Sequence, residues 1–222
     1  MAIAITNLLE EADTTGGDPV TTTGSVTTVA GRYYIVTVHS STDPTVASVT
    51  LPGTITEAEI LNEVRGTVLR VSVWSGECTS GGTGTVTVDF SGATSGTIII
   101  VDEVTGHDTT GTIVQAVGND GSSGTASATL AAFGDATNNA GYFGCGINSA
   151  IEIVEEATFT ELGQGSFSTP TRAGITAWDI GQDTSPSATF TSSQWAIVAL
   201  EIKADTGAAA AAPKRLLLLG AG

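Results

Sequence analysis

The chain has 222 residues, of which 41% are hydrophobic, so it is long and apolar enough to bury a substantial core. It carries 23 acidic and seven basic residues, and its formal net charge of −16 argues against nucleic acid or an anionic membrane surface as a partner. The 28 glycines, with the abundant threonine, serine and valine, favour strands and tight turns over helices.

The N-terminal residues and the cysteines indicate the cellular compartment in which the chain is made and folds. Met1–Ile5 lacks basic residues and is followed closely by Glu10 and Glu11, unlike a secretory signal. No run approaches the roughly 20 apolar residues of a membrane span. Two cysteines, Cys78 and Cys145, are too few for a disulfide framework. We therefore expect synthesis in a cytoplasm and buried free thiols, although the sequence also allows a bond between the two.

The first third of the chain contains one segment with a helical pattern. Residues 1–24 are expected to form an arm, in which residues 3–11 are either a short helix or extended. Arg32–His39 is apolar on both faces, which predicts a central strand. Thr56–Val64 begins with a Thr-x-x-Glu pattern that fits a capping box, so we expect a helix there, with a polar loop as the alternative.

The remainder predicts short strands between turns. Glycines in Ala140–Ile147 are expected to permit close packing of that strand. Gln194–Lys203 is the most strand-like run, and we expect it to pair with Thr171–Ile180 across an edge segment at Ser187–Phe190. Other strands are expected at 25–29, 45–51, 67–74, 85–90, 97–104, 112–117, 125–131, 151–154 and 157–162, with turns at 78–84 and 118–124.

This pattern predicts one all-β domain. The expected fold is an antiparallel β-sandwich, jelly-roll-like, with an extended N-terminal arm and a C-terminal tail. The expected boundaries are an arm at 1–24, a β-sandwich domain at 25–203, and a spacer with a C-terminal anchoring tail at 204–222.

Several runs of this sequence resemble Thr- and Gly-rich β-sandwich proteins of tailed bacteriophages, which are minor structural, decoration or fibre-like virion proteins. The runs that carry the resemblance are Thr27–Val38, Thr85–Gly92, Val101–Thr110, Ala128–Gly134, Trp195–Lys203 and the ending Pro213–Gly220. The resemblance covers most of residues 20–203. It implies a sandwich on a virion, and it carries no catalytic site.

Candidate catalytic residues have a plainer interpretation. His107 and Asp108, beside Asp102 and Glu103, are a candidate acid–base group, but no nucleophile motif accompanies them, so turn chemistry is the expected role. His39 is interpreted as ending a strand. The acidic residues Glu152, Glu155, Glu156 and Glu161 are candidates for the paired carboxylates of a glycosidase. The expected alternative is that they form a solvated acidic strand edge.

Other residues are candidates for binding calcium or sugar. Calcium candidates are Asp13 with Asp18, Asn119 with Asp120, Asp135 with Asn138 and Asn139, and Asp179 with Asp183, which Asx turns also explain. Trp74, Trp178 and Trp195 are candidates for a sugar-stacking platform. The expected alternative is that each of them packs in the core. We therefore expect no catalytic, cofactor-binding or metal-binding residues.

The tail is the one place where a functional interpretation is preferred. Ala208–Ala212 is followed by Pro213, the basic pair Lys214 and Arg215, and four leucines. Burial of a leucine side chain stabilises a protein by about 1.5–3 kcal/mol, so we expect four consecutive leucines to be buried against another surface. The predicted partner-binding residues are Lys214, Arg215, Leu216, Leu217, Leu218 and Leu219.

The resulting hypothesis is a structural virion protein that is attached through its termini, first as a capsid decoration protein. Its expected partners are other virion proteins, such as the major capsid or tail protein, and further copies of itself. The alternatives are a tail or head-fibre component, a lectin-like module that binds host surface glycans, and an enzyme such as a glycosidase with two facing carboxylates.

Overall fold

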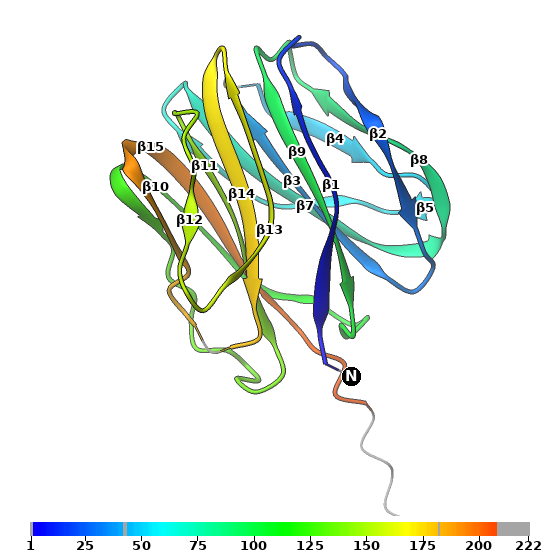
Figure 1. The fold of residues 1–222 in the computed structure, drawn as a ribbon. Helices are drawn as coiled ribbons and strands as arrows, with labels where there is room; N and C mark the ends of the chain where they lie inside the picture. Colours follow the sequence, from blue (N-terminus) through cyan, green and yellow to red (C-terminus); the bar gives the residue numbers. More distant parts are fainter. Residues whose placement is uncertain (1, 42–43, 182, 208–222) are drawn as a thin grey trace, which may run out of the picture.

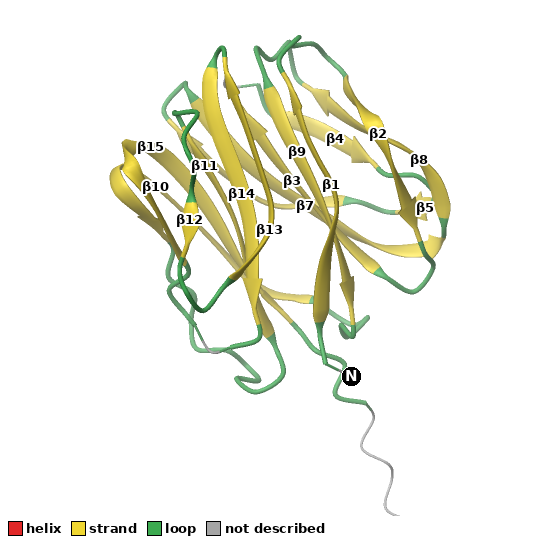
Figure 2. Cartoon of the chain, viewed as in Figure 1, coloured by secondary structure: helices red, strands yellow, loops and turns green. Residues whose placement is uncertain are grey.

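The described part of the chain consists of strands and loops. A computed structural model describes residues 2–41, 44–181 and 183–207 (Figure 1). Within these residues every regular element is a strand, and all strand pairs are antiparallel (Figure 2). The prediction of an all-β antiparallel sandwich is confirmed, while the jelly-roll connectivity stays a prediction.

Two six-stranded sheets and one three-stranded sheet make up the body. The central sheet has the order β1-β9-β3-β7-β5, with β6 also paired to β7. Its strands are β1 (Ala4–Asp13), β3 (Tyr33–Ser40), β5 (Thr54–Ile55), β6 (Ala58–Arg65), β7 (Leu69–Ser80) and β9 (Thr97–Thr105).

The central sheet lies between the other two. The back sheet has the order β10-β15-β11-β14-β13, with β12 also paired to β15, and the front sheet has the order β2-β8-β4. The back strands are β10 (Ile113–Ser127), β11 (Ala140–Ile147), β12 (Val154–Glu155), β13 (Thr160–Ser168), β14 (Thr171–Asp179) and β15 (Ser187–Ile202). The front strands are β2 (Val20–Thr28), β4 (Val46–Thr50) and β8 (Gly82–Phe90).

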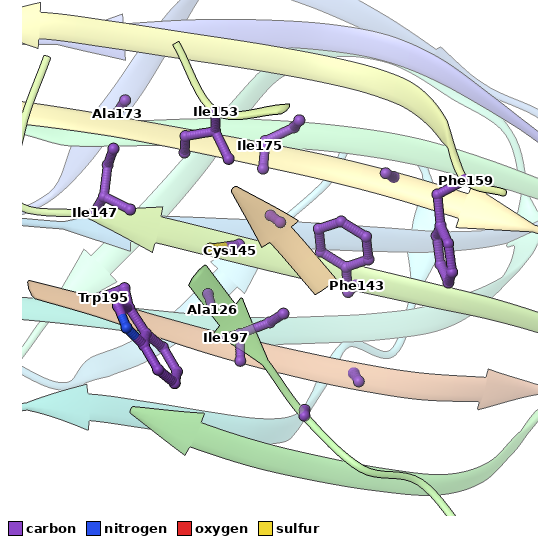
Figure 3. Packing of buried hydrophobic residues seen from close by; sticks show 14 of the residues in the cluster. Ala126, Phe143, Cys145, Ile147, Ile153, Phe159, Ala173, Ile175, Trp195 and Ile197 are labelled. Carbon is purple, nitrogen blue, oxygen red and sulfur yellow. The ribbon is translucent and has the colours of Figure 1, made fainter. Parts of the chain in front are cut away.

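Three large apolar clusters fill the layers. One lies between the front and central sheets and includes Val36, Val86 and Val101, and a second lies between the central and back sheets and includes Ile35 and Val198. The third covers the outer face of the back sheet, where the segments around Ile153 and Phe159 close over β11 and β14 (Figure 3). Because both faces of β3 are covered, all eight of its residues are buried, which confirms the expected central strand.

Glycines allow the central and back sheets to approach closely. A Cβ atom at Gly144 of β11 would lie 2.6 Å from the Thr37 Cγ2 atom of β3. A Cβ atom at Gly174 of β14 would lie 2.6 Å from the His39 ring. The expectation that glycines in Ala140–Ile147 permit close packing is therefore confirmed.

Replacement of Gly144 by alanine is expected to lower the free energy of unfolding by about 2 kcal/mol, because the added methyl group overpacks the contact with Thr37. Gly92→Ala is the matched control, since nothing lies within 4 Å of a Cβ atom at Gly92. Urea unfolding of the two variants measures the difference. Equal midpoints would show that the sheets have room to spare at this point.

Two local predictions were wrong for reasons of tertiary pairing. Thr56–Val64 is not a helix, because residues 58–65 form β6 and pair with β7 along seven registered positions. Residues 118–124 do not turn, because β10 runs through them in register with β15. Gly121 lies opposite Trp195, and a Cβ atom there would come within 2.5 Å of the indole ring. Gly121 makes room for this large neighbour, which local sequence does not show.

The pairing of the last strand also differs from the prediction. β15 does not pair with β14; β11 lies between them and pairs with both. Ser187–Phe190 is no separate edge segment, since it is the start of β15. Residues 4–13, expected in an arm, form β1 and pair with β9 at the edge of the central sheet. The strand-like character and burial of Trp195–Ile202 are confirmed.

Candidate functional site

One end of the sandwich carries both ends of the described chain (Figure 1). β1 starts there beside the end of β9, with Ala4 opposite Thr105. β15 also finishes there, and its continuation forms a bridge between Ala204 and His107. We call this end, formed by residues 2–4, 105–112, 134–139 and 203–207, the terminal end.

Backbone hydrogen bonds hold the departing chain against the loop after β9. The Asp108 N–H donates to the Lys203 carbonyl at 2.9 Å, and the Asp205 N–H donates to the Gly106 carbonyl at 2.8 Å. Gly106 has a φ of 72°, and a Cβ atom there would lie 2.1 Å from the Ala2 carbonyl oxygen. Only glycine suits this position, because it combines left-handed backbone with close approach of the N-terminal strand.

A buried carboxylate fixes the other side of the terminal end. Glu201 is fully buried and accepts hydrogen bonds from the side chains of Gln115 (2.7 Å) and Asn139 (2.6 Å) and from the backbone N–H of Gly134 (2.8 Å). The Asn139 side-chain oxygen in turn accepts from the Ala204 N–H at 3.0 Å. A buried charge with three donors is well satisfied, so it ties β10, the 134–139 loop and the departing chain together.

The His107 and Asp108 side chains have separate partners. The His107 ring is buried, with Nε2 2.7 Å from Glu77 Oε2 and the ring centroid 5.4 Å from that of Tyr33. Asp108 pairs with Lys203 Nζ at 2.7 Å. The Lys203 ammonium, followed by the Thr110 N–H, holds the pKa of Asp108 below its usual value. Both contacts fasten the loop after β9 to neighbouring strands.

The neighbouring acids do not join this pair. Strand alternation sends Asp102 and Glu103 to opposite faces of β9. Asp102 accepts from the Tyr142 hydroxyl at 2.9 Å between the central and back sheets, whereas Glu103 accepts from the Tyr34 hydroxyl at 2.9 Å and pairs with Arg32. The four residues grouped by the sequence thus have separate roles in holding the layers together.

Most of the remaining sequence candidates make structural contacts within the fold. Asp13, Asp18, Asp135 and Asp183 accept backbone N–H groups, and Asp120 pairs with Arg65. Glu156 accepts from the Ser187 N–H, and Glu161 accepts from the Gln164 side chain. The described residues contain no cluster of three or more His, Cys, Asp or Glu side chains arranged to hold a metal ion.

The three tryptophans lie in three different apolar clusters. Trp74 is packed between the front and central sheets, Trp178 packs against the cluster between the central and back sheets, and Trp195 lies on the outer face of the back sheet. Because layers of strands separate them, they do not form one sugar-stacking platform. Cys78 and Cys145 are free and buried, as expected, and burial raises the pKa of the Cys145 thiol.

Charge is distributed unevenly between the body and the tail. All 23 acidic residues but only five of the seven basic residues lie in residues 1–207. All five have contacts inside the body: Arg32 with Glu103, Arg65 with Asp120, Arg70 with the Asn62 side chain, Lys203 with Asp108, and Arg172 with the Asn148 side chain and the Ser41 carbonyl. The body therefore presents a negative surface.

The predicted partner-binding residues, Lys214 to Leu219, lie outside the described residues. The structure does place Gly207, the last described residue before them, at the terminal end. Local sequence gave no sign of Glu201, Asn139 and Glu77 as the residues that secure this end, because their partners are 30 to 86 positions away.

Comparisons with protein-family models, with curated proteins and with solved structures return no match. No helix in the described ranges has the length and apolar character needed to cross a membrane.

Proposed function

We propose that this protein is a structural component of a tailed-phage virion, in the first place a capsid decoration protein, and that it attaches through its terminal end. The observation that carries the proposal is the departure of the chain at Gly207 beside the first strand, from a point secured by buried contacts (Figure 1). The resemblance of its sequence runs to virion sandwiches supports the same proposal.

The architecture suits a body that is held at one end. β15 pairs with β10 on one side and β11 on the other, so a load on the tail reaches an interior strand of the back sheet directly. Glu201, near the end of β15, spreads the same load to β10 and the 134–139 loop. The opposite end and the negative surface are then left facing solvent, where net charge discourages non-specific association.

Deleting residues 208–222 is expected to reduce incorporation into particles at least tenfold while leaving the body folded. The deletion point follows from the structure, since Ala204 and Asp205 are still bonded to the body. Incorporation is measured by immunoblot of purified particles from a host that assembles them, and folding by circular dichroism. Deleting only residues 220–222 is the control, because it keeps the basic pair and the leucines. Normal incorporation of the longer deletion would refute attachment through the tail.

A further inference from the structure

An apolar hollow lies at the terminal end, directly beside the departing chain. Its volume is about 490 Å³, within the range of ligand-sized pockets, which is roughly 300–1,000 Å³. Its lining contains Gly111, Val114, Gly134, Ala204 and Thr206, together with the polar residues Asp135, Asn139 and Lys203. Val114 is 46% exposed, one of four large hydrophobic side chains exposed in the described part of the chain. Burial of this surface against apolar side chains lowers the free energy of the protein.

The leucine run of the same chain is within reach of the hollow. Leu216 lies nine residues beyond Gly207, and nine extended residues span up to about 30 Å. Thr206 itself lines the hollow, so the chain leaves the body at its edge. A short tether gives the leucines an effective concentration in the millimolar range, which favours docking in the same chain over capture by a second copy.

Charge around the hollow fits the residues that precede the leucines. Asp135 lines the hollow, and hydrogen bonds from the Asn138 side chain and the Thr137 N–H hold its pKa below the usual value. Lys203, which also lines it, is already paired with Asp108. The carboxylate of Asp135 therefore gives the hollow a negative edge, which complements the positive pair Lys214 and Arg215.

We propose that in the free protein Leu216–Leu219 occupy the hollow beside Val114 of their own chain, with Lys214 and Arg215 at Asp135. The free protein then hides the surface that would otherwise promote aggregation. This docking does not depend on the proposed function. Attachment to a virion would in addition require the leucines to leave the hollow and bind another virion protein, and only that step rests on the proposed function.

Trypsin cleavage after Lys214 and Arg215 in the full-length protein tests this docking. Mass spectrometry follows the loss of the C-terminal residues from the native protein. Val114→Asp is expected to accelerate cleavage about tenfold, because it places a charge in the apolar wall. Val154→Asp is the matched control, since Val154 is 49% exposed on β12, away from the hollow, and its cleavage rate should equal that of the wild type.

Three outcomes would overturn the inference. Equal cleavage of Val114→Asp and wild type would show that the tail does not use the hollow, and equal acceleration by Val154→Asp would show a general effect. Protection that rises with protein concentration would place the leucines on a second copy instead. If Val114→Asp does not fold by circular dichroism, Asp135→Asn decides: acceleration of about threefold supports docking, and no acceleration contradicts it. Normal particle incorporation of these variants leaves the proposed function intact in every case.

Discussion

Acidification from pH 6.5 to pH 4 is expected to cost the wild-type protein about 3 kcal/mol of stability through His39 alone. The His39 ring is buried between the central and back sheets, and neither ring nitrogen has a hydrogen-bond partner among the described residues. Burial lowers its pKa from 6.5 to about 3. Below pH 6.5 the unfolded chain therefore binds a proton that the folded chain excludes, so stability is lost as pH falls towards 3.

Replacement of His39 by leucine is expected to remove this loss. Leucine fills similar space and has no group to protonate or to leave without a partner, so stability at pH 7 should stay equal or rise by about 1 kcal/mol. Urea unfolding of both proteins at pH 7, 5 and 4 gives the difference in free energy. A difference that does not grow as pH falls would mean that His39 is protonated inside the fold.

Replacement of Asp102 by asparagine is expected to act in the opposite pH direction. Burial raises the Asp102 pKa from 3.8 to about 6, although hydrogen bonds from Asn7 and Tyr142 oppose the shift. The folded chain thus holds a proton more tightly than the unfolded chain, and wild-type stability falls by about 2 kcal/mol as pH rises from 4 to 6. Above about pH 7 the loss stays constant.

The Asp102→Asn protein should lack this fall and should exceed the wild type in stability at pH 7 by about 2–3 kcal/mol. The amide oxygen can still accept from the Asn7 side chain, now 3.0 Å from Asp102 Oδ1, and the Tyr142 hydroxyl can donate to Thr37, 2.8 Å away. Thermal and urea unfolding at pH 4 and pH 7 measure the effect. A variant that is less stable than the wild type at both pH values would show that the carboxylate is indispensable to the network.

The sequence predicted those elements whose pattern is decided locally. Alternation of Val86, Val88 and Phe90 and the apolar faces of Arg32–His39 were sufficient to predict β8 and β3, since burial of each face is visible in the residues themselves. The predictions failed where a distant partner decides the structure. Pairing with β7 made β6 a strand, and the indole ring of Trp195 required the glycine at position 121.

The terminal end was predictable only in part. The tail is conspicuous because basic and apolar residues are adjacent in sequence, whereas the contacts that secure its base join Glu201 to Gln115, Gly134 and Asn139. Those partners are separated by 62 to 86 positions, so their meeting depends on strand order. Strand order in turn depended on β11 lying between β14 and β15, which short-range patterns do not encode.

The most direct test of attachment through the terminal end is site-specific photo-crosslinking in assembled particles. A photoreactive amino acid is placed at Leu217 in the tail, or at Thr169 in the turn between β13 and β14, which lies at the opposite end of the body (Figure 1). We expect Leu217 to cross-link to another virion protein and Thr169 to give no such product. Cross-links from Thr169 with none from Leu217 would contradict attachment through the terminal end.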